Sequence, residues 1–193
     1  MALLALSVAS LASNSPSDAC PAPHRKAFEG CVIDGLFITT QGANFAAMPE
    51  DLADELEGKR VSVVGWTVRG AFSPQLSTLQ VGDACDLRAQ GPALRDGLVR
   101  AHDFYAFRRL NDEHLDLAED HIERAIELDH SSFESYLLRA RIFLAMDHRR
   151  RAHASARHAL SLAQEDHEVI LCEAFLTQLE PNRVSTQEPR DAR

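Results

Sequence analysis

The chain lacks several features that would place a protein in a functional class at once. No apolar run reaches the roughly 20 residues that a membrane-spanning helix needs. Basic residues are in deficit, with 20 Lys and Arg against 29 Asp and Glu and a net charge of −9. General nucleic-acid binders carry a basic face, so this balance argues against a nucleic-acid partner. What is present is an ordinary globular composition over 193 residues, enough for one domain or two small ones.

Motifs for catalysis and metal binding are also missing from the sequence. There is no CxxC pair, so a zinc knuckle or a thioredoxin-type site lacks its usual spacing. The nine histidines form no HExxH motif, and no GxSxG elbow is present to hold a nucleophilic serine. The sequence therefore predicts no catalytic residues, no metal ligands and no cofactor, and indicates that the protein is not an enzyme.

The first twelve residues are typical of a targeting segment. Ala2 to Ala12 (ALLALSVASLA) is apolar and small, as in a signal-peptide core, and Ser10 and Ala12 suit the positions before a cleavage site. We therefore expect export to the periplasm or the extracellular space, followed by a flexible linker over residues 13–27. No Lys or Arg precedes the apolar core, so the alternative is a cytoplasmic protein in which this segment is not a signal.

The four cysteines bear on the same question. They are Cys20, Cys31, Cys85 and Cys172. In an oxidising compartment they are expected to pair, and three full pairings are open. Cys172 lies in an apolar helical stretch and is interpreted as a small buried side chain. Pairing is therefore expected among the other three.

Residues 28–90 are predicted to form a small β-rich domain. The run from Cys31 to Thr40 is rich in β-branched and aromatic residues and predicts a strand. A short helix is expected next, because Pro49 suits the first helical turn and Gly58 suits the C-terminal cap. The domain is thus expected to be α+β or barrel-like.

The strongest strand is predicted from Lys59 to Gly70 (KRVSVVGWTVRG). Its apolar residues change parity near Gly65, which predicts a β-bulge at that glycine. A further strand or strand pair is expected over Leu79–Leu87, with Gly82-Asp83 as its turn.

The segment from Leu56 to Gly65 (LEGKRVSVVG) resembles the first strand of oligonucleotide/oligosaccharide-binding (OB) barrels. In those strands a Gly-Lys-x-Val-x-Val-x-Gly pattern lets the chain coil around the barrel. The resemblance implies ligand contacts at Trp66, Arg69 and Phe72, with single-stranded nucleic acid or a saccharide as ligand. The competing interpretation places Trp66 in the core and Arg69 in solvent.

From Leu98 onward the apolar period changes from two residues to 3.6, which predicts helices. The expected helices are Leu98–Leu110, Glu113–Leu128, Ser131–Ala145, Arg149–Ala163 and His167–Leu179. Residues 180–193 contain two prolines and many polar side chains, as disordered tails do. Residues 98–179 are therefore expected to form an all-α array.

The helices recur with a period of 34 residues (152 minus 118, and 159 minus 125). Ala118 and Ala125 of one helix correspond to Ala152 and Ala159 of a later one. A helix-turn-helix period of this length resembles the tetratricopeptide repeat (TPR) family, in which small residues stand where paired helices cross closely.

The second repeat matches the family pattern in most detail. Tyr136, Ala140 and Phe143 stand at its first aromatic, small and second aromatic positions. Ala106 takes the small position of the first repeat, and Ala174 takes that of a last, unpaired helix. The aromatic positions of the first repeat and the repeat-ending prolines depart from the pattern.

The TPR resemblance implies that another protein or peptide binds along the concave surface made by the first helix of each repeat. Carried over by register, this surface includes Arg100, Asp103, Phe107, Leu110 and Asn111 from the first repeat, and Glu134, Leu137, Arg141, Leu144 and Ala145 from the second. The competing interpretation is that these residues are solvated or pack between repeats.

Two repeats and one capping helix are few for a stable array. Either the β-rich domain packs on the first helix or the chain forms a homodimer. The predicted fold is therefore α+β, with a small β-rich, OB-like domain followed by a TPR-like array of helical hairpins. The predicted function is that of a protein-protein adaptor or scaffold, and the alternative is a ligand-binding protein that uses the OB-like domain.

Overall fold

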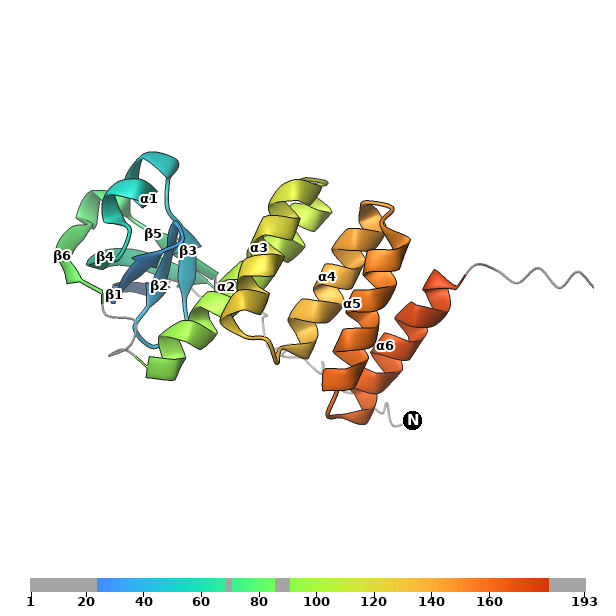
Figure 1. Ribbon diagram of the computed structural model, residues 1–193. Helices are drawn as coiled ribbons and strands as arrows, with labels where there is room; N and C mark the ends of the chain where they lie inside the picture. Colours follow the sequence, from blue (N-terminus) through green and yellow to red (C-terminus); the bar gives the residue numbers. More distant parts are fainter. Residues whose placement is uncertain (1–23, 69–70, 86–90, 181–193) are drawn as a thin grey trace, which may run out of the picture.

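The computed structural model describes residues 24–68, 71–85 and 91–180, and every structural statement below refers to these residues. They form an antiparallel sheet with one short helix, followed by a row of five helices (Figure 1). This arrangement confirms the predicted α+β class, with a β domain first and a helical array second. The predicted signal segment, most of the predicted linker, Arg69 and the predicted disordered tail after Glu180 lie outside the described residues.

The sheet has the strand order β3-β2-β1-β4-β5, with β6 paired to β4 off this path. The strands are β1 (His24–Ile33), β2 (Leu36–Thr39), β3 (Phe45–Ala47), β4 (Lys59–Val68), β5 (Ala71–Pro74) and β6 (Gln80–Ala84). The two ends of the path, β3 and β5, lie in contact, so the sheet is a nearly closed small barrel. The helix α1 (Glu50–Leu56) connects β3 to β4.

The barrel core explains the irregular apolar pattern of β4. Val61 and Val63 point inward and are 1% and 2% exposed, and Gly65 continues the same face. A Cβ atom on Gly65 would lie 2.4 Å from the Phe72 ring, so glycine makes room for that ring. The pairing of β1 with β4 runs past Gly65 without a shift, and the irregularity lies between Lys59 and Val61 on the β6 side. The bulge predicted at Gly65 is therefore wrong.

The strand predicted over Cys31–Thr40 is in fact two strands joined by a tight turn. Asp34 and Gly35 have φ angles of 53° and 70° and reverse the chain between β1 and β2. An Asp-Gly pair with positive φ at both residues is a common two-residue hairpin turn. A second turn prediction also fails, because Gly82-Asp83 lies within β6.

The domain boundaries differ from the predicted ones in two places. β1 begins at His24, because its first residues pair with the end of β4, so residues 24–27 of the predicted linker belong to the sheet. The segment that resembles a first OB strand is the fourth strand of this sheet. The first helix of the array begins at Gly91, ahead of the predicted Leu98, with Pro92 in its first turn.

Five helices follow the barrel. They are α2 (Gly91–Asn111), α3 (Leu115–Leu128), α4 (Phe133–Ala145), α5 (Arg149–Leu162) and α6 (Asp166–Leu179). Each packs on the next, and α2 also contacts α4 (Figure 1). Among the described residues no helix has the length and apolar character needed to cross a membrane.

The backbone of the array repeats with the period seen in the sequence. Glu113 between α2 and α3 has a φ of 62°, and Asp147 between α4 and α5 has a φ of 59° (147 minus 113 is 34). The alanines at the helix crossings, Ala118, Ala125, Ala152 and Ala159, are all 0% exposed. Small side chains let the paired helices approach closely, so the helical, repeat-like character of residues 91–179 is a property of the structure as well as of the sequence.

The helix α2 belongs to both parts of the molecule. Leu94 and Leu98 pack into the barrel cluster that contains Ile33 and Ile38, while Val99 and Ala106 pack into the core of the array. One of the predicted packing options, the β domain on the first helix, is therefore observed.

A disulfide joins Cys31 of β1 to Cys85, with 6.0 Å between their Cα atoms, and it lies beside this shared core. Cys172 is buried and has a free thiol. The predicted roles of these three cysteines are thus confirmed.

Candidate functional site

The outer face of α2 carries exposed side chains at spacings of three and four residues. They are Arg100, Phe104, Phe107 and Asn111. Such spacings place side chains on one face of a helix. Phe104 and Phe107 each expose 48% of their surface, so the face presents two large aromatic rings to solvent.

The same pattern recurs on α4. The corresponding residues, 34 positions later, are Glu134, Leu138, Arg141 and Ala145 (134 minus 100, and 141 minus 107). Leu138 is half-buried and the other three are exposed. Equivalent positions of adjacent repeats face the same way, and α2 contacts α4. We call these eight residues the array stripe.

The array stripe contains most of the predicted partner-binding residues. Those on it are Arg100, Phe107, Asn111, Glu134, Arg141 and Ala145. Phe104 and Leu138 were missed by sequence reasoning, although their own 34-residue spacing was available as a signal. Arg100 is also tied to the barrel, since its guanidinium donates a 2.6 Å hydrogen bond to the Gly42 carbonyl.

Four predicted residues lie off the stripe. Leu110 and Leu144 are half-buried, and Leu137 is 6% exposed within the core of the array. Asp103 accepts a 2.8 Å hydrogen bond from the Ser135 hydroxyl of α4. Burial raises the pKa of Asp103 to about 6, although the bond from Ser135 acts in the opposite direction. These side chains are engaged between helices.

The residues of the OB-type alternative are only partly on the surface. Phe72 contacts the rings of Phe28 and Phe37 in the barrel core, at 4.6 and 5.6 Å between centroids. Trp66 is half-buried, and the Arg25 guanidinium lies 5.7 Å from its ring. Phe72 also lines a groove of about 390 Å³ between the barrel and α2. Tyr105, Arg108 and Arg109 lie among the other residues of this groove.

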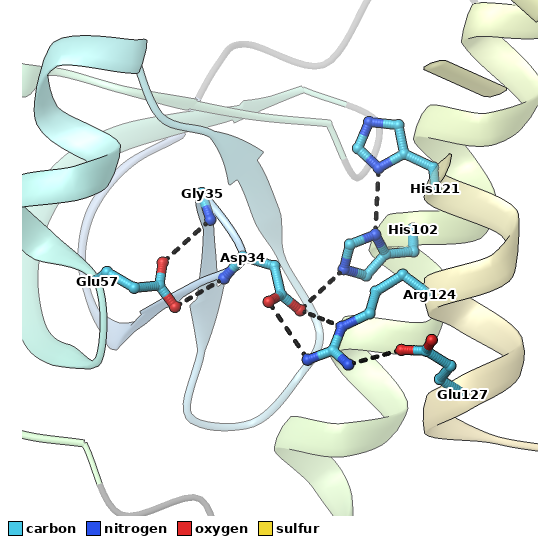
Figure 2. Close-up of polar contacts among 7 residues, drawn as sticks. All are labelled: Asp34, Gly35, Glu57, His102, His121, Arg124 and Glu127. Atoms are coloured by element: carbon cyan, nitrogen blue, oxygen red, sulfur yellow. Dashed lines mark hydrogen bonds and ion pairs between the residues drawn. The ribbon is translucent and has the colours of Figure 1, made fainter. Parts of the chain in front are cut away.

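A polar cluster that the sequence did not predict joins the barrel to the array (Figure 2). It brings Asp34 of the β1–β2 turn to His102 of α2 and to His121, Arg124 and Glu127 of α3. The turn itself is held by Glu57, whose carboxylate accepts hydrogen bonds from the backbone N–H groups of Asp34 (3.0 Å) and Gly35 (3.2 Å).

Asp34 is the centre of this cluster. Arg124 donates two hydrogen bonds to its carboxylate, at 2.7 and 3.3 Å, and the His102 Nε2 atom lies 3.4 Å away. The His102 contact lowers the pKa of Asp34 most, burial opposes that effect, and Arg124 lowers it further, so the pKa is about 2. Arg124 also pairs with Glu127 at 2.9 Å, so one guanidinium is shared between two carboxylates.

The two histidines extend the cluster inward. Their Nδ1 atoms are 3.1 Å apart. A hydrogen bond between them requires a proton on the Nδ1 atom of one ring and an unprotonated Nδ1 atom, as acceptor, on the other ring. His102 is 3% exposed, and its Nε2 atom faces Asp34 without a hydrogen bond of good geometry. Burial and the neighbouring His102 both lower the pKa of His121, which favours the neutral form.

The chemistry of the polar cluster is that of a docking contact. Its guanidinium bridges the carboxylates of the β1–β2 turn and of α3, and no hydroxyl or thiol nucleophile lies among its residues. Within the described ranges, no group of three or more His, Cys, Asp or Glu side chains is arranged to hold a metal ion. The cluster therefore fixes the barrel against α2 and α3, and the absence of catalysis stays a prediction.

No protein-family model, curated protein or solved structure matches the chain. The TPR and OB resemblances therefore rest on the residues that carry them.

Proposed function

We propose that this protein is an adaptor that binds a segment of another protein along the array stripe. The observation that carries the proposal is the repetition on α2 and α4 of one pattern in which three or four of the four side chains are exposed, with Phe104 and Phe107 each 48% exposed. Large aromatic rings are usually buried in soluble helices, and aromatic and arginine side chains are enriched in protein interfaces.

The aromatic part of the stripe is held in place by its neighbours. The Phe104 ring lies 5.5 Å from Phe45 of β3 and 5.3 Å from Tyr105. A ring held by packing loses little conformational freedom on binding, which favours affinity. The barrel thus supports the proposed binding surface.

The charged part of the stripe indicates the chemistry of the partner. Arg141 is exposed and takes part in no ion pair with the described residues. An arginine binds a carboxylate with two parallel hydrogen bonds. The partner segment is therefore expected to carry an apolar side chain for the two rings and an acidic residue for Arg141.

The test compares the whole chain with two stripe variants, Phe107→Ala and Arg141→Glu. A control, Arg157→Glu, makes the same charge reversal on the exposed side of α5. Partners captured from the native host by the wild-type chain are identified, and the bound segment is titrated directly by fluorescence anisotropy. We expect each stripe variant to weaken binding by about tenfold or more, as interface hot spots do, and the control to bind normally. Equal binding by all four proteins would contradict the proposal.

A second candidate function is ligand binding by the barrel, which the OB resemblance implies. The observation in its favour is the groove that Arg108 and Arg109 line together with Phe72 and Tyr105. Aromatic and basic side chains together suit a single-stranded nucleic acid.

Trp66 is the chain's single tryptophan and reports from the barrel. Titration of its fluorescence with a short oligothymidylate and with an oligosaccharide tests this candidate. Oligonucleotide binding that weakens steeply with salt would support it. An unchanged signal, together with no binding heat for either probe, would oppose it.

We also propose that the protein works after export, in an oxidising space. The apolar segment Ala2–Ala12 and the Cys31–Cys85 disulfide support this, since such bonds are rare in reducing compartments. Fractionation of the native host, with the thiols blocked before lysis, would locate the protein and show whether the bond is formed. A cytoplasmic protein with both thiols reduced would contradict the proposal.

A further inference from the structure

Two histidine rings meet nitrogen to nitrogen where α2 packs on α3 (Figure 2). His102 of α2 is 3% exposed, and its second ring nitrogen, Nε2, lies 3.4 Å from the carboxylate of Asp34. His121 of α3 is half-buried, and its ring centroid lies 5.7 Å from that of Tyr105. Histidine is the side chain that ordinarily gains or loses a proton near neutral pH, so this contact can change its number of protons.

The carboxylate of Asp34 decides where the protons lie when both rings are neutral. Each neutral ring carries a single N–H group. A proton on Nε2 of His102 is attracted by the negative charge of Asp34, whereas a lone pair at that atom is repelled by it. His102 therefore carries its proton on Nε2 and accepts at Nδ1, and His121 donates from its own Nδ1 atom across the 3.1 Å contact.

The pair can hold one added proton without losing this contact. If His121 takes the proton on its Nε2 atom, its Nδ1 atom still donates to His102. If His102 takes the proton, His121 changes tautomer and its Nδ1 atom becomes the acceptor. In both cases one proton lies between the two Nδ1 atoms, and Asp34 supplies a negative charge beside the pair.

A second added proton is incompatible with the contact. Both Nδ1 atoms would then carry protons directed at each other across 3.1 Å, and two positive rings would adjoin. Like charges repel strongly in a partly buried site, because water screens them little. Burial lowers the pKa of His121 most, and the positive charges of His102 and Arg109 lower it further, whereas Asp120 of α3 raises it by less.

The acidic groups around the pair are engaged or lose their charge in acid. Both carboxylate oxygens of Asp34 already accept hydrogen bonds from Arg124 of α3. Asp103, beside His102 on α2, accepts a 2.8 Å hydrogen bond from Ser135 of α4. Burial raises the pKa of Asp103 to about 6, so this carboxylate becomes neutral as the pH falls and does not offset a second proton.

We propose that the His102–His121 pair is a proton-controlled latch between α2 and α3. The latch is closed while the pair holds at most one added proton, and a second proton opens it. Because His121 is half-buried, its ring turns to solvent on opening, while His102 keeps its proton beside Asp34. Opening removes one contact of the polar cluster that fixes the barrel against the array, so acid loosens this junction. The latch does not depend on the proposed adaptor function.

Nitrogen-15 nuclear magnetic resonance of the histidine rings in the full wild-type chain tests the latch directly. At pH 7.5 we expect a proton on one of the two Nδ1 atoms and none on the other. As the pH falls below the usual histidine pKa of about 6.5, both rings should become fully protonated, and the nuclear Overhauser contacts of His121 with His102 and Tyr105 should disappear. Two unprotonated Nδ1 atoms at pH 7.5 would overturn the proposal, as would full protonation of both rings with these contacts intact.

Proton uptake on unfolding tests whether the latch contributes to stability. Because the pKa of His121 is lowered in the folded protein, the unfolded chain binds more protons, and the free energy of unfolding falls as the pH drops below about 6.5. Urea denaturation from pH 7.5 to pH 5 should show up to about one more proton taken up by the wild type than by His121→Asn. The asparagine amide lies where Nδ1 was and does not titrate. Comparing the two chains also removes the contribution of Asp103, which has the opposite sign.

The matched control is His153→Asn, the same change at an exposed histidine of α5. Its proton uptake should equal that of the wild type. Parallel curves for the wild type and His121→Asn would overturn the proposal, and so would an equal effect of His153→Asn. The ring measurements need the wild-type chain alone, so they decide the question even if His121→Asn does not fold.

Discussion

Asp34 and Asp103 have opposite electrostatic environments, although both contact α2 or lie on it. Asp34 faces Arg124 and His102, which stabilise its charge and hold its pKa at about 2. Asp103 is half-buried between α2 and α4 with a serine hydroxyl as its hydrogen-bond partner, and its pKa is about 6. The first aspartate therefore stabilises the fold when ionised, and the second destabilises it when ionised.

Replacing Asp103 with Asn is expected to raise the free energy of unfolding at pH 7 by about 1–3 kcal/mol. The folded pKa of about 6 lies above the usual aspartate value of 3.8, so ionisation is harder in the folded protein. In the wild type, this effect makes the free energy of unfolding rise as pH falls from about 6 to about 4. The Asn variant removes this pH dependence, and its amide oxygen can still accept the hydrogen bond from the Ser135 hydroxyl. Urea denaturation from pH 4 to pH 8 measures both effects. Asp54→Asn, on the exposed side of α1, is the control, and no gain for Asp103→Asn over it would refute the explanation.

Replacing Asp34 with Asn is expected to lower the free energy of unfolding at pH 7 by about 2 kcal/mol. The folded pKa of about 2 lies below 3.8, so the stabilisation is complete above pH 3.8 and is lost as pH falls towards 2. Asparagine tolerates the positive φ of this position, so the turn is retained. Chemical denaturation should show the difference between variant and wild type shrinking towards pH 2. A difference that is constant with pH would point to a loss of packing instead of charge.

The crossing alanines control how closely the helices of the array pack. Ala125 of α3 is 0% exposed, whereas Ala154 of α5 is exposed. We expect Ala125→Leu to overpack the crossing and to lower stability by about 1–3 kcal/mol, and Ala159→Leu to act in the same way. Ala154→Leu adds the same atoms on the surface and should change stability by less than about 0.5 kcal/mol. Thermal unfolding compares the three, and unchanged stability in both buried variants would count against close packing at these positions.

The helices were far more predictable than the first two strands. Each helix after α2 begins and ends within a few residues of its expected bounds, since the apolar period of 3.6 reports one covered side. The strands β1 and β2 gave no such alternation, because Val32, Ile33 and Phe37 are all at most 5% exposed and both faces of these strands are covered. A continuous apolar run hides the Asp34-Gly35 turn that interrupts it.

At the scale of the whole molecule, α2 couples the barrel to the array. Two of its faces contribute to two cores, and the salt bridge between Asp34 and Arg124 spans the same junction. A shared helix of this kind makes separate unfolding of the two parts unfavourable. We therefore expect Trp66 fluorescence, which reports the barrel, and far-ultraviolet circular dichroism, which reports the helices, to give the same urea midpoint. Two distinct midpoints would show that the parts unfold independently.

The sequence by itself determined the order of the parts, the helical period and the positions of the small crossing residues. These features are local or regularly spaced, so the hydrophobic pattern records them directly. Only the tertiary structure decided which distant groups meet, namely Cys31 with Cys85, Asp34 with Arg124, and His102 with His121. It also decided that Phe104 faces solvent while Leu137 is covered. The physical reason is that periodicity shows which face of an element is apolar, whereas the neighbour that covers the face is set by the packing of the whole chain.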